Sequence, residues 1–217
     1  MHDEFVRGIA RFREQYADNL PWDPEAVARG QSPKIAMLTC SDSRVVPHLT
    51  TSSGVGRLFM LRNAGNFVPR PGTGSSEEAS MVCAVDVLRV EHAIVCGHTH
   101  CFAVTALNGN WSKLDPALIR WLENAERAGT AASPLAQVEH NVITQVARLK
   151  RLPCVHNALA AGRLQVHGMV YDIESGRFTV YDAASGTFVG VDEREPSKRM
   201  SYTDCTSTTC GGISMAV

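Results

Sequence analysis

The sequence predicts an α/β domain with a mainly parallel central sheet flanked by helices. Short apolar runs of strand length alternate with helical segments over most of the chain, and this alternation is typical of parallel sheets joined by crossover helices. The 217 residues, of which 44% are hydrophobic, are enough for one well-packed core. We therefore expect a single domain over residues 1–217, with a helical arm over about residues 1–30 and a tail over about residues 192–217.

The amino-terminal half contains the first three expected strands. An amphipathic helix is expected first, over residues 3–18, because Phe5, Ile9, Phe12 and Tyr16 recur at helical spacing. Ser75 and Glu78 fit a capping box, which predicts a helix from there to about residue 90. The expected strands are the apolar runs KIAMLT (34–39), RLFMLRN (57–63) and HAIVCG (92–97).

The carboxyl-terminal half continues the alternation. Asp115-Pro116 and Ser133-Pro134 each place an N-cap residue before a proline at the first helical position. The expected helices cover about residues 116–128, 134–151 and 152–162, the last of them ending at Gly162. The expected strands are LQVHGMVYDI (164–173) and RFTVYDA (177–183), separated by the turn residues ESG.

Charge and hydropathy exclude several classes of partner. The formal net charge is −1, and there is no basic stripe or polybasic tail, so we expect neither a nucleic-acid nor an anionic-membrane partner. No apolar run approaches the roughly 20 residues that a membrane span requires. The charged amino terminus lacks the apolar region of a secretory signal, which predicts a cytoplasmic protein.

Two clusters of metal-ligating residues follow the first and third expected strands. The first strand ends in CSDSR (40–44) and the third in CGHTHC (96–101). In a parallel sheet the carboxyl ends of the strands share one edge, so Cys40 can meet His98 and Cys101 there. Two thiolates and one imidazole suit zinc, and three protein ligands leave the fourth position open, as in catalytic zinc sites.

Asp42 and Arg44 lie within the first cluster. Asp42 can accept a hydrogen bond from a zinc-bound water, and Arg44 can hold this carboxylate ionised and oriented. Each signal has a simpler explanation when taken alone: Cys40 as a small buried hydrophobe, and Asp42 with Arg44 as a structural ion pair. Their combination at the ends of two adjacent strands favours the metal site.

The motifs CSDSR, RNAGNFVP and CGHTHC, in this order and spacing, resemble the β-class carbonic anhydrases from about residue 4 to residue 191. GQSPK, EHNVITQVARL and VHGMVYDIESG also agree with that family. The resemblance implies one zinc per chain, held by Cys40, His98 and Cys101, with Asp42 and Arg44 as a catalytic pair. It also implies that Gln31 hydrogen-bonds the substrate or bicarbonate. Met37 stands where an aromatic residue marks the bicarbonate-inhibited members, which favours the open form of the zinc site.

The family resemblance further implies a homodimer, or a dimer of dimers, in which the amino-terminal helix packs on a partner. The expected activity is that of a lyase, the reversible hydration of CO2 to bicarbonate and a proton. An apolar approach suits CO2, and Phe59, Ala64, Val68 and Cys83 are candidates for its wall. Alternatives are hydrolysis of a CO2 isostere such as CS2 or COS, and a non-catalytic zinc protein in which Asp42 is the fourth ligand.

Some positions depart from the family pattern or leave two interpretations open. Phe102 replaces the usual glycine after the last ligand, and Cys83 replaces an aromatic residue of the pocket wall, which could be a compensating exchange of bulk. His100, between the ligands, is either an exposed bystander or an added proton acceptor. Cys205 and Cys210 form either a redox pair or two exposed thiols.

Overall fold

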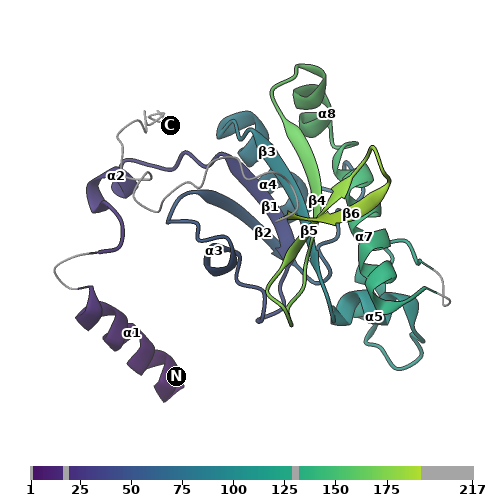
Figure 1. The fold of residues 1–217 in the computed structure, drawn as a ribbon, viewed down its shortest axis with the longest axis horizontal. Coiled ribbons are helices and arrows are strands. Elements are labelled where there is room, and N and C mark those ends of the chain that lie inside the picture. Colours follow the sequence, from purple (N-terminus) through teal and green to yellow (C-terminus); the bar gives the residue numbers. More distant parts are fainter. Residues whose placement is uncertain (1, 17–19, 129–131, 192–217) are drawn as a thin grey trace.

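The computed structural model describes residues 2–16, 20–128 and 132–191. Its centre is one six-stranded sheet with the strand order β2-β1-β3-β4-β5-β6 (Figure 1). The strands are β1 (Ile35–Cys40), β2 (Leu58–Asn63), β3 (His92–His98), β4 (Gln165–Tyr171), β5 (Phe178–Asp182) and β6 (Thr187–Gly190). The first four are parallel to one another, whereas β5 and β6 are added antiparallel. The prediction of a mainly parallel sheet flanked by helices is confirmed.

The helices are short, apart from α1 and α7. They are α1 (Asp3–Gln15), α2 (Pro24–Ala28), α3 (Pro47–Thr50), α4 (Ser76–Val82), the π-helical turn η1 (Cys83–Val87), α5 (Phe102–Asn108), α6 (Pro116–Leu122), α7 (Pro134–Leu149) and α8 (Pro153–Ala160). Within the described ranges, no helix has the length and hydropathy needed to cross a membrane.

Three helix starts, those of α4, α6 and α7, follow the capping signals in the sequence. Asp115 and Ser133 accept hydrogen bonds from Ala117 N and Ala136 N, and a proline follows each of them. Ser75 caps α4 through Glu78 N at 3.1 Å. The Glu78 carboxylate does not complete the expected capping box; it binds the backbone N–H groups of Gly72 and Gly74 instead.

Several elements differ from the sequence prediction. The helix expected to reach residue 90 ends as α4, and η1 follows it, closed by a bond from Leu88 N to Cys83 O. The prediction missed α2, α3, α5 and β6. These elements have four to seven residues each, too few to establish a hydrophobic period.

Helix α7 packs directly on β3 and β4. A Cβ atom at Gly97 would lie 2.7 Å from Val142, and one at Gly168 would lie 2.9 Å from the same side chain. Glycine at these two strand positions therefore allows the helix axis to come close to the sheet. This contact places one face of α7 against β3 and β4.

Helix α1 extends away from the sheet (Figure 1). None of its residues is buried, and Phe5 (63% exposed), Ile9 and Phe12 present the apolar face that the sequence predicted. The contact of this face with a partner, and the extents predicted for the arm and the tail, remain predictions. Cys205 and Cys210 lie outside the described residues.

Candidate metal centre

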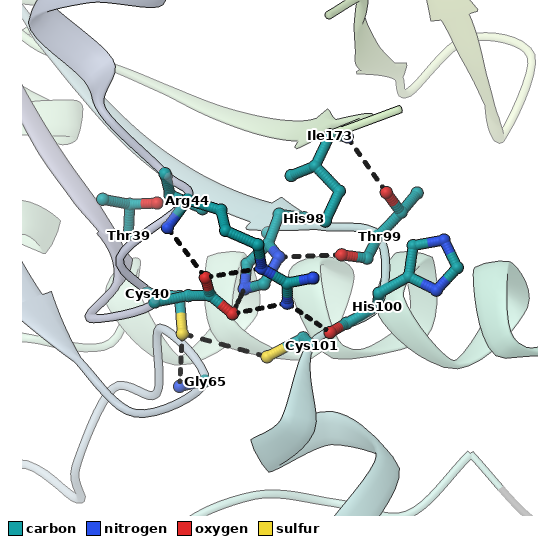
Figure 2. Close-up of polar contacts among 12 residues, drawn as sticks. Thr39, Cys40, Arg44, Gly65, His98, Thr99, His100, Cys101 and Ile173 are labelled. Atoms are coloured by element: carbon teal, nitrogen blue, oxygen red, sulfur yellow. Dashed lines mark hydrogen bonds and ion pairs between the residues drawn. The ribbon is translucent and has the colours of Figure 1, made fainter. Parts of the chain in front are cut away.

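The three predicted ligands meet at the carboxyl edge of the sheet. Cys40 ends β1, His98 ends the neighbouring parallel strand β3, and Cys101 is the N-cap residue of α5. Their ligand atoms all lie within 4.8 Å of one another, and the two sulfur atoms are 3.9 Å apart (Figure 2). All three side chains are buried.

His98 carries the strongest sign that this cluster holds a cation. Its Nδ1 lies 2.8 Å from Thr99 O, and because a carbonyl only accepts, Nδ1 carries the proton and Nε2 carries a lone pair. The imidazole is fully buried, yet Nε2 has no hydrogen-bond partner. A buried polar atom without a partner is unfavourable, and a metal ion at this position would satisfy it.

The donor set and its spacing fit zinc. Zinc prefers tetrahedral sulfur and nitrogen ligands, and Zn–S bonds of about 2.3 Å place two sulfur atoms about 3.8 Å apart. The observed separation of 3.9 Å agrees with this value. It is too long for a disulfide, and both cysteines are free thiols.

The two thiols titrate as a pair. The hydrogen bond between them lowers the pKa of Cys40, whose sulfur also accepts from the N–H of Gly65 at 3.4 Å. The same bond, together with burial, raises the pKa of Cys101. One proton therefore leaves the pair readily and the second leaves reluctantly, and a bound cation favours the loss of both.

Asp42 and Arg44 lie beside the cluster as a bidentate ion pair. Nε and Nη2 of Arg44 donate to the two carboxylate oxygens, and Oδ2 of Asp42 lies 3.9 Å from His98 Nε2. The Arg44 guanidinium holds the pKa of the Asp42 carboxyl well below its usual range, against the opposing effect of burial. Nη2 of Arg44 also donates to the carbonyl of His100 at 3.1 Å.

Arg62 fixes the loop that carries this pair, a role the sequence analysis missed. Its guanidinium reaches across from β2 and donates to the carbonyl oxygens of Cys40, Asp42 and Val45 at 2.8 to 3.0 Å. The sequence places Arg62 one residue before the end of an expected strand, but the pairing of that strand with β1 comes from the structure.

Thr99 and Asp172 were also missed. Thr99 N donates to Tyr171 O, and the Thr99 hydroxyl donates to Asp172. The same hydroxyl accepts from Ile173 N (Figure 2). These three bonds fix the carbonyl to which His98 Nδ1 donates. Orientation of a ligating histidine through its second nitrogen is general in metal sites.

The predicted substrate-binding residues fall into two groups. The first group, Ala64 and Phe102, lies next to the cluster. Ala64 precedes Gly65, whose N–H binds the Cys40 sulfur. Phe102 follows Cys101, and its side chain is 65% exposed. The second group lies farther along the chain from the ligands. Phe59 pairs with Ala36, which is four residues before Cys40 on β1. Cys83 begins η1 and is half-buried, and Val68 is buried in the main core.

Gln31 lies far from the cluster within its own chain. It precedes β1, whereas Cys40 ends that strand, and the five steps along β1 cover about 16 Å at roughly 3.3 Å per residue. Gln31 therefore lies toward the amino edge of the sheet. The contact of Gln31 with the metal centre remains a prediction.

His100 lies between the ligands in sequence but not in space. Its φ of 56° is left-handed, and Figure 2 shows its ring pointing away from Cys40 and Cys101. The ring is exposed and lies 3.2 Å from Glu174. This placement favours the exposed bystander over the proton acceptor.

Known proteins resemble this chain in sequence. A family model described as carbonic anhydrase matches residues 35–178. The chain is 46% identical over 206 residues to a carbonic anhydrase of Pseudomonas aeruginosa, covering 88% of this chain and 92% of that protein. It is 37% identical over 204 residues to a carbonic anhydrase of Synechococcus elongatus, covering 88% and 75%.

The fold agrees with the sequence comparisons. The structure of the β-carbonic anhydrase CcaA superposes with a TM-score of 0.80 at 36% identity, covering 86% of this chain and 98% of that one. The β-carbonic anhydrase of Coccomyxa, solved with acetazolamide, gives a TM-score of 0.71 at 27% identity, with coverages of 81% and 84%. The family model, the sequence relatives and the superposed structures thus agree, and the chain belongs to the β class of the carbonic anhydrase family.

Proposed function

We propose that this protein is a zinc-dependent lyase that catalyses the reversible reaction CO2 + H2O ⇌ HCO3⁻ + H⁺. The observation that carries the proposal is the buried, unpartnered Nε2 of His98 beside the thiols of Cys40 and Cys101. These three residues would hold one zinc ion per chain. Bound there, zinc supplies a Lewis acid that brings the pKa of a coordinated water toward neutrality.

Asp42 would orient the attacking oxygen. Its Oδ1 accepts two bonds from Arg44, whereas Oδ2 accepts one, from Nη2. A lone pair of Oδ2 is therefore available on the atom that lies nearest to His98 Nε2. That oxygen can accept a hydrogen bond from the nucleophile, so that the nucleophile's own lone pair is directed at the carbon of CO2. Arg44 keeps the carboxylate ionised and in this orientation.

The remaining pocket residues would come from two chains. Ala64 and Phe102 lie beside the cluster of their own chain. Gln31, which lies toward the opposite edge of the sheet, would donate to bicarbonate oxygens from a second copy. We therefore propose a homodimer, or a dimer of such dimers, as the active form.

The alternatives have less support. A non-catalytic zinc site closed by Asp42 requires the carboxylate to leave Arg44, to which it makes three hydrogen bonds. No feature of the described residues favours CS2 or COS over CO2. The proposal includes the predicted cytoplasmic location, which cell fractionation can test.

Zinc content and CO2 hydration, measured together, test the proposal. The wild-type protein should bind one zinc per chain and hydrate CO2. Cys40→Ser should lose both, because an alcohol is a poor anionic ligand at neutral pH. The matched control is Cys154→Ala, which removes another buried thiol, in α8, and should change neither. Full zinc retention in Cys40→Ser would reject the ligand assignment.

A further inference from the structure

The thiolate ligand Cys40 accepts a hydrogen bond from the loop that follows β2. The donor is the backbone N–H of Gly65, 3.4 Å from Cys40 Sγ (Figure 2). A hydrogen bond to sulfur favours the charged form of a thiol and fixes the direction of its lone pairs. The residues that hold Gly65 in place therefore also influence the charge and orientation of the Cys40 sulfur.

Only glycine fits at this position. The φ of Gly65 is +87°, a left-handed conformation that residues with side chains rarely adopt. A Cβ atom there would lie 2.6 Å from the ring of Phe67 and 3.0 Å from Ala103. The backbone of the loop thus packs directly against its surroundings, with its N–H directed at Cys40.

Two buried amides of α7 hold the other side of this loop. Asn141 Nδ2 donates to Gly65 O at 3.0 Å, and Gln145 Nε2 donates to Asn141 Oδ1 at 3.1 Å. Gln145 Oε1 in turn accepts from Val68 N at 2.8 Å. This chain of three bonds ties α7 to the loop at two points, on either side of Phe67.

These amides occupy an otherwise apolar face of the helix. Asn141 is 1% exposed and Gln145 is 0% exposed, and Val138, Val142 and Val146 are buried on the same helix. Packing alone would be served by apolar side chains, since burying an amide is unfavourable unless its hydrogen bonds are made. Here the bonds are made, and they lead to two backbone groups of the loop, Gly65 O and Val68 N.

We propose that Asn141 and Gln145 are positioning residues of the metal centre, which direct the Gly65 N–H onto the Cys40 sulfur. The inference rests on the proposed function, since it takes Cys40 as a zinc ligand. The hydrogen bonds of these two side chains run to the loop and to each other, and none runs to a ligand residue within the described part of the chain. Both act through the backbone of the loop, so their loss should change the properties of the bound metal as well as the stability of the fold.

The first test is zinc affinity, measured by competition with a chromogenic chelator. Asn141→Leu removes the bond to Gly65 O, and the double variant Asn141→Leu/Gln145→Met removes the whole relay at similar volume. Loss of an outer partner of a metal ligand typically weakens affinity about 10- to 100-fold, and we expect a loss in this range for both variants. The matched control, Val146→Ala, opens a cavity on the same helix and should lower thermal stability without changing zinc affinity.

A spectroscopic test separates positioning from general loosening. With Co²⁺ in place of zinc, the thiolate-to-metal charge-transfer band should shift in both Asn141 variants and stay unchanged in Val146→Ala. In the unmodified protein loaded with ¹¹³Cd, the Gly65 amide proton should show a scalar coupling to the metal through the Cys40 sulfur. The cadmium experiment needs no variant, so it remains decisive if the variants fail to fold.

The outcomes distinguish this inference from the proposed function. If the wild-type protein binds no zinc, the proposed function fails, and this inference fails with it. If the wild type binds zinc but the folded Asn141 variants match Val146→Ala in affinity and Co²⁺ spectrum, only the positioning role is wrong. Absence of the Gly65 coupling in the cadmium form would also overturn it.

Discussion

Arg44 binds both carboxylate oxygens of Asp42, with 2.9 Å from Nε to Oδ1 and 2.7 Å from Nη2 to Oδ2. The backbone N–H of Arg44 adds a third bond to Oδ1 at 3.0 Å. The two residues are only two positions apart, so the loop has to turn tightly to make this contact. The clamp of Arg62 on three carbonyls of the same segment accounts for the turn.

Asp42→Asn should lower turnover by about 10²- to 10⁴-fold, the usual range for a residue that handles a proton in the transition state. The amide keeps the size of the carboxylate but loses its charge and its pairing with Arg44. Zinc content should remain at one per chain, because the three ligands are untouched. Stopped-flow CO2 hydration together with metal analysis makes the comparison. Wild-type turnover in the variant would remove Asp42 from the mechanism.

The pH dependence of activity should reflect one group only. Arg44 lowers the pKa of Asp42, so the carboxylate stays ionised as the pH falls and loses its charge only in strong acid. It therefore does not titrate in the neutral range. kcat/KM measured from about pH 6 to pH 9 should rise smoothly along a single titration of the metal-bound water, displaced to alkaline pH by the two thiolates. A steep, cooperative loss below about pH 8, with Asp42 on the metal, would show that a closed state governs the protein.

Thr99→Val should weaken zinc binding by about 10-fold or more, the usual effect of losing a partner that orients a ligand. Valine keeps the shape of threonine but cannot bond to Asp172 or to Ile173 N, so the carbonyl that binds His98 Nδ1 is less firmly held. Chelator competition measures the effect. Thr50→Val is the matched control, because among the described residues the Thr50 hydroxyl bonds to carbonyls of α3 and its cap. Equal affinities in the two variants would contradict the role of Thr99.

The sequence predicted those parts of the site that depend on strand ends. Cys40, His98 and Cys101 follow two apolar runs of strand length, and neighbouring parallel strands bring their carboxyl ends together whatever separates them in the chain. It missed Arg62, Thr99 and Asp172, because their contacts depend on strand order and on the turn after β4, which no local pattern encodes. Gln31 was predicted from family resemblance alone, and resemblance does not say which copy of a chain supplies a residue.

For the fold too, features set by local sequence were predicted, and features set by tertiary contacts were missed. Proline and N-cap pairs predicted the starts of α6 and α7, since a cap is a local hydrogen bond. The break between α4 and η1 was missed because it depends on tertiary contacts: Arg163 donates to Val85 O and to the Asp86 carboxylate within that turn. The apolar face of α1 was predicted and is present, whereas its contact with a partner remains a prediction.

Deleting residues 1–18 should weaken self-association. Phe5, Ile9 and Phe12 are exposed on α1, and such an apolar face gains stability only when it is covered. Sedimentation velocity over a range of concentrations measures the change. Phe5→Ser/Ile9→Ser should have a similar effect, whereas Arg11→Ser, on the same helix, should not. A concentration-independent monomer for the intact chain would show that the dimer is wrong.

The position of Gln31 can be tested by mixing two variants of low activity, one altered at Gln31 and the other at Cys40. Gln31 lies before β1 and Cys40 ends it, so in a dimer with complementary contacts each site would combine Cys40 of one chain with Gln31 of the other. Gln31→Ala and Cys40→Ser should each lower activity when made alone.

In a hybrid of the two variants, the chain with Gln31→Ala keeps Cys40 and the chain with Cys40→Ser keeps Gln31. One site of the hybrid is then intact, and the other carries both defects. Mixing equal amounts, after partial dissociation and reassociation, should raise CO2 hydration well above the mean of the separate proteins. Mixing Cys40→Ser with Asp42→Asn is the control, because both changes fall on the same side of the site and no hybrid restores it. If both mixtures stay at the mean, Gln31 does not act across the interface.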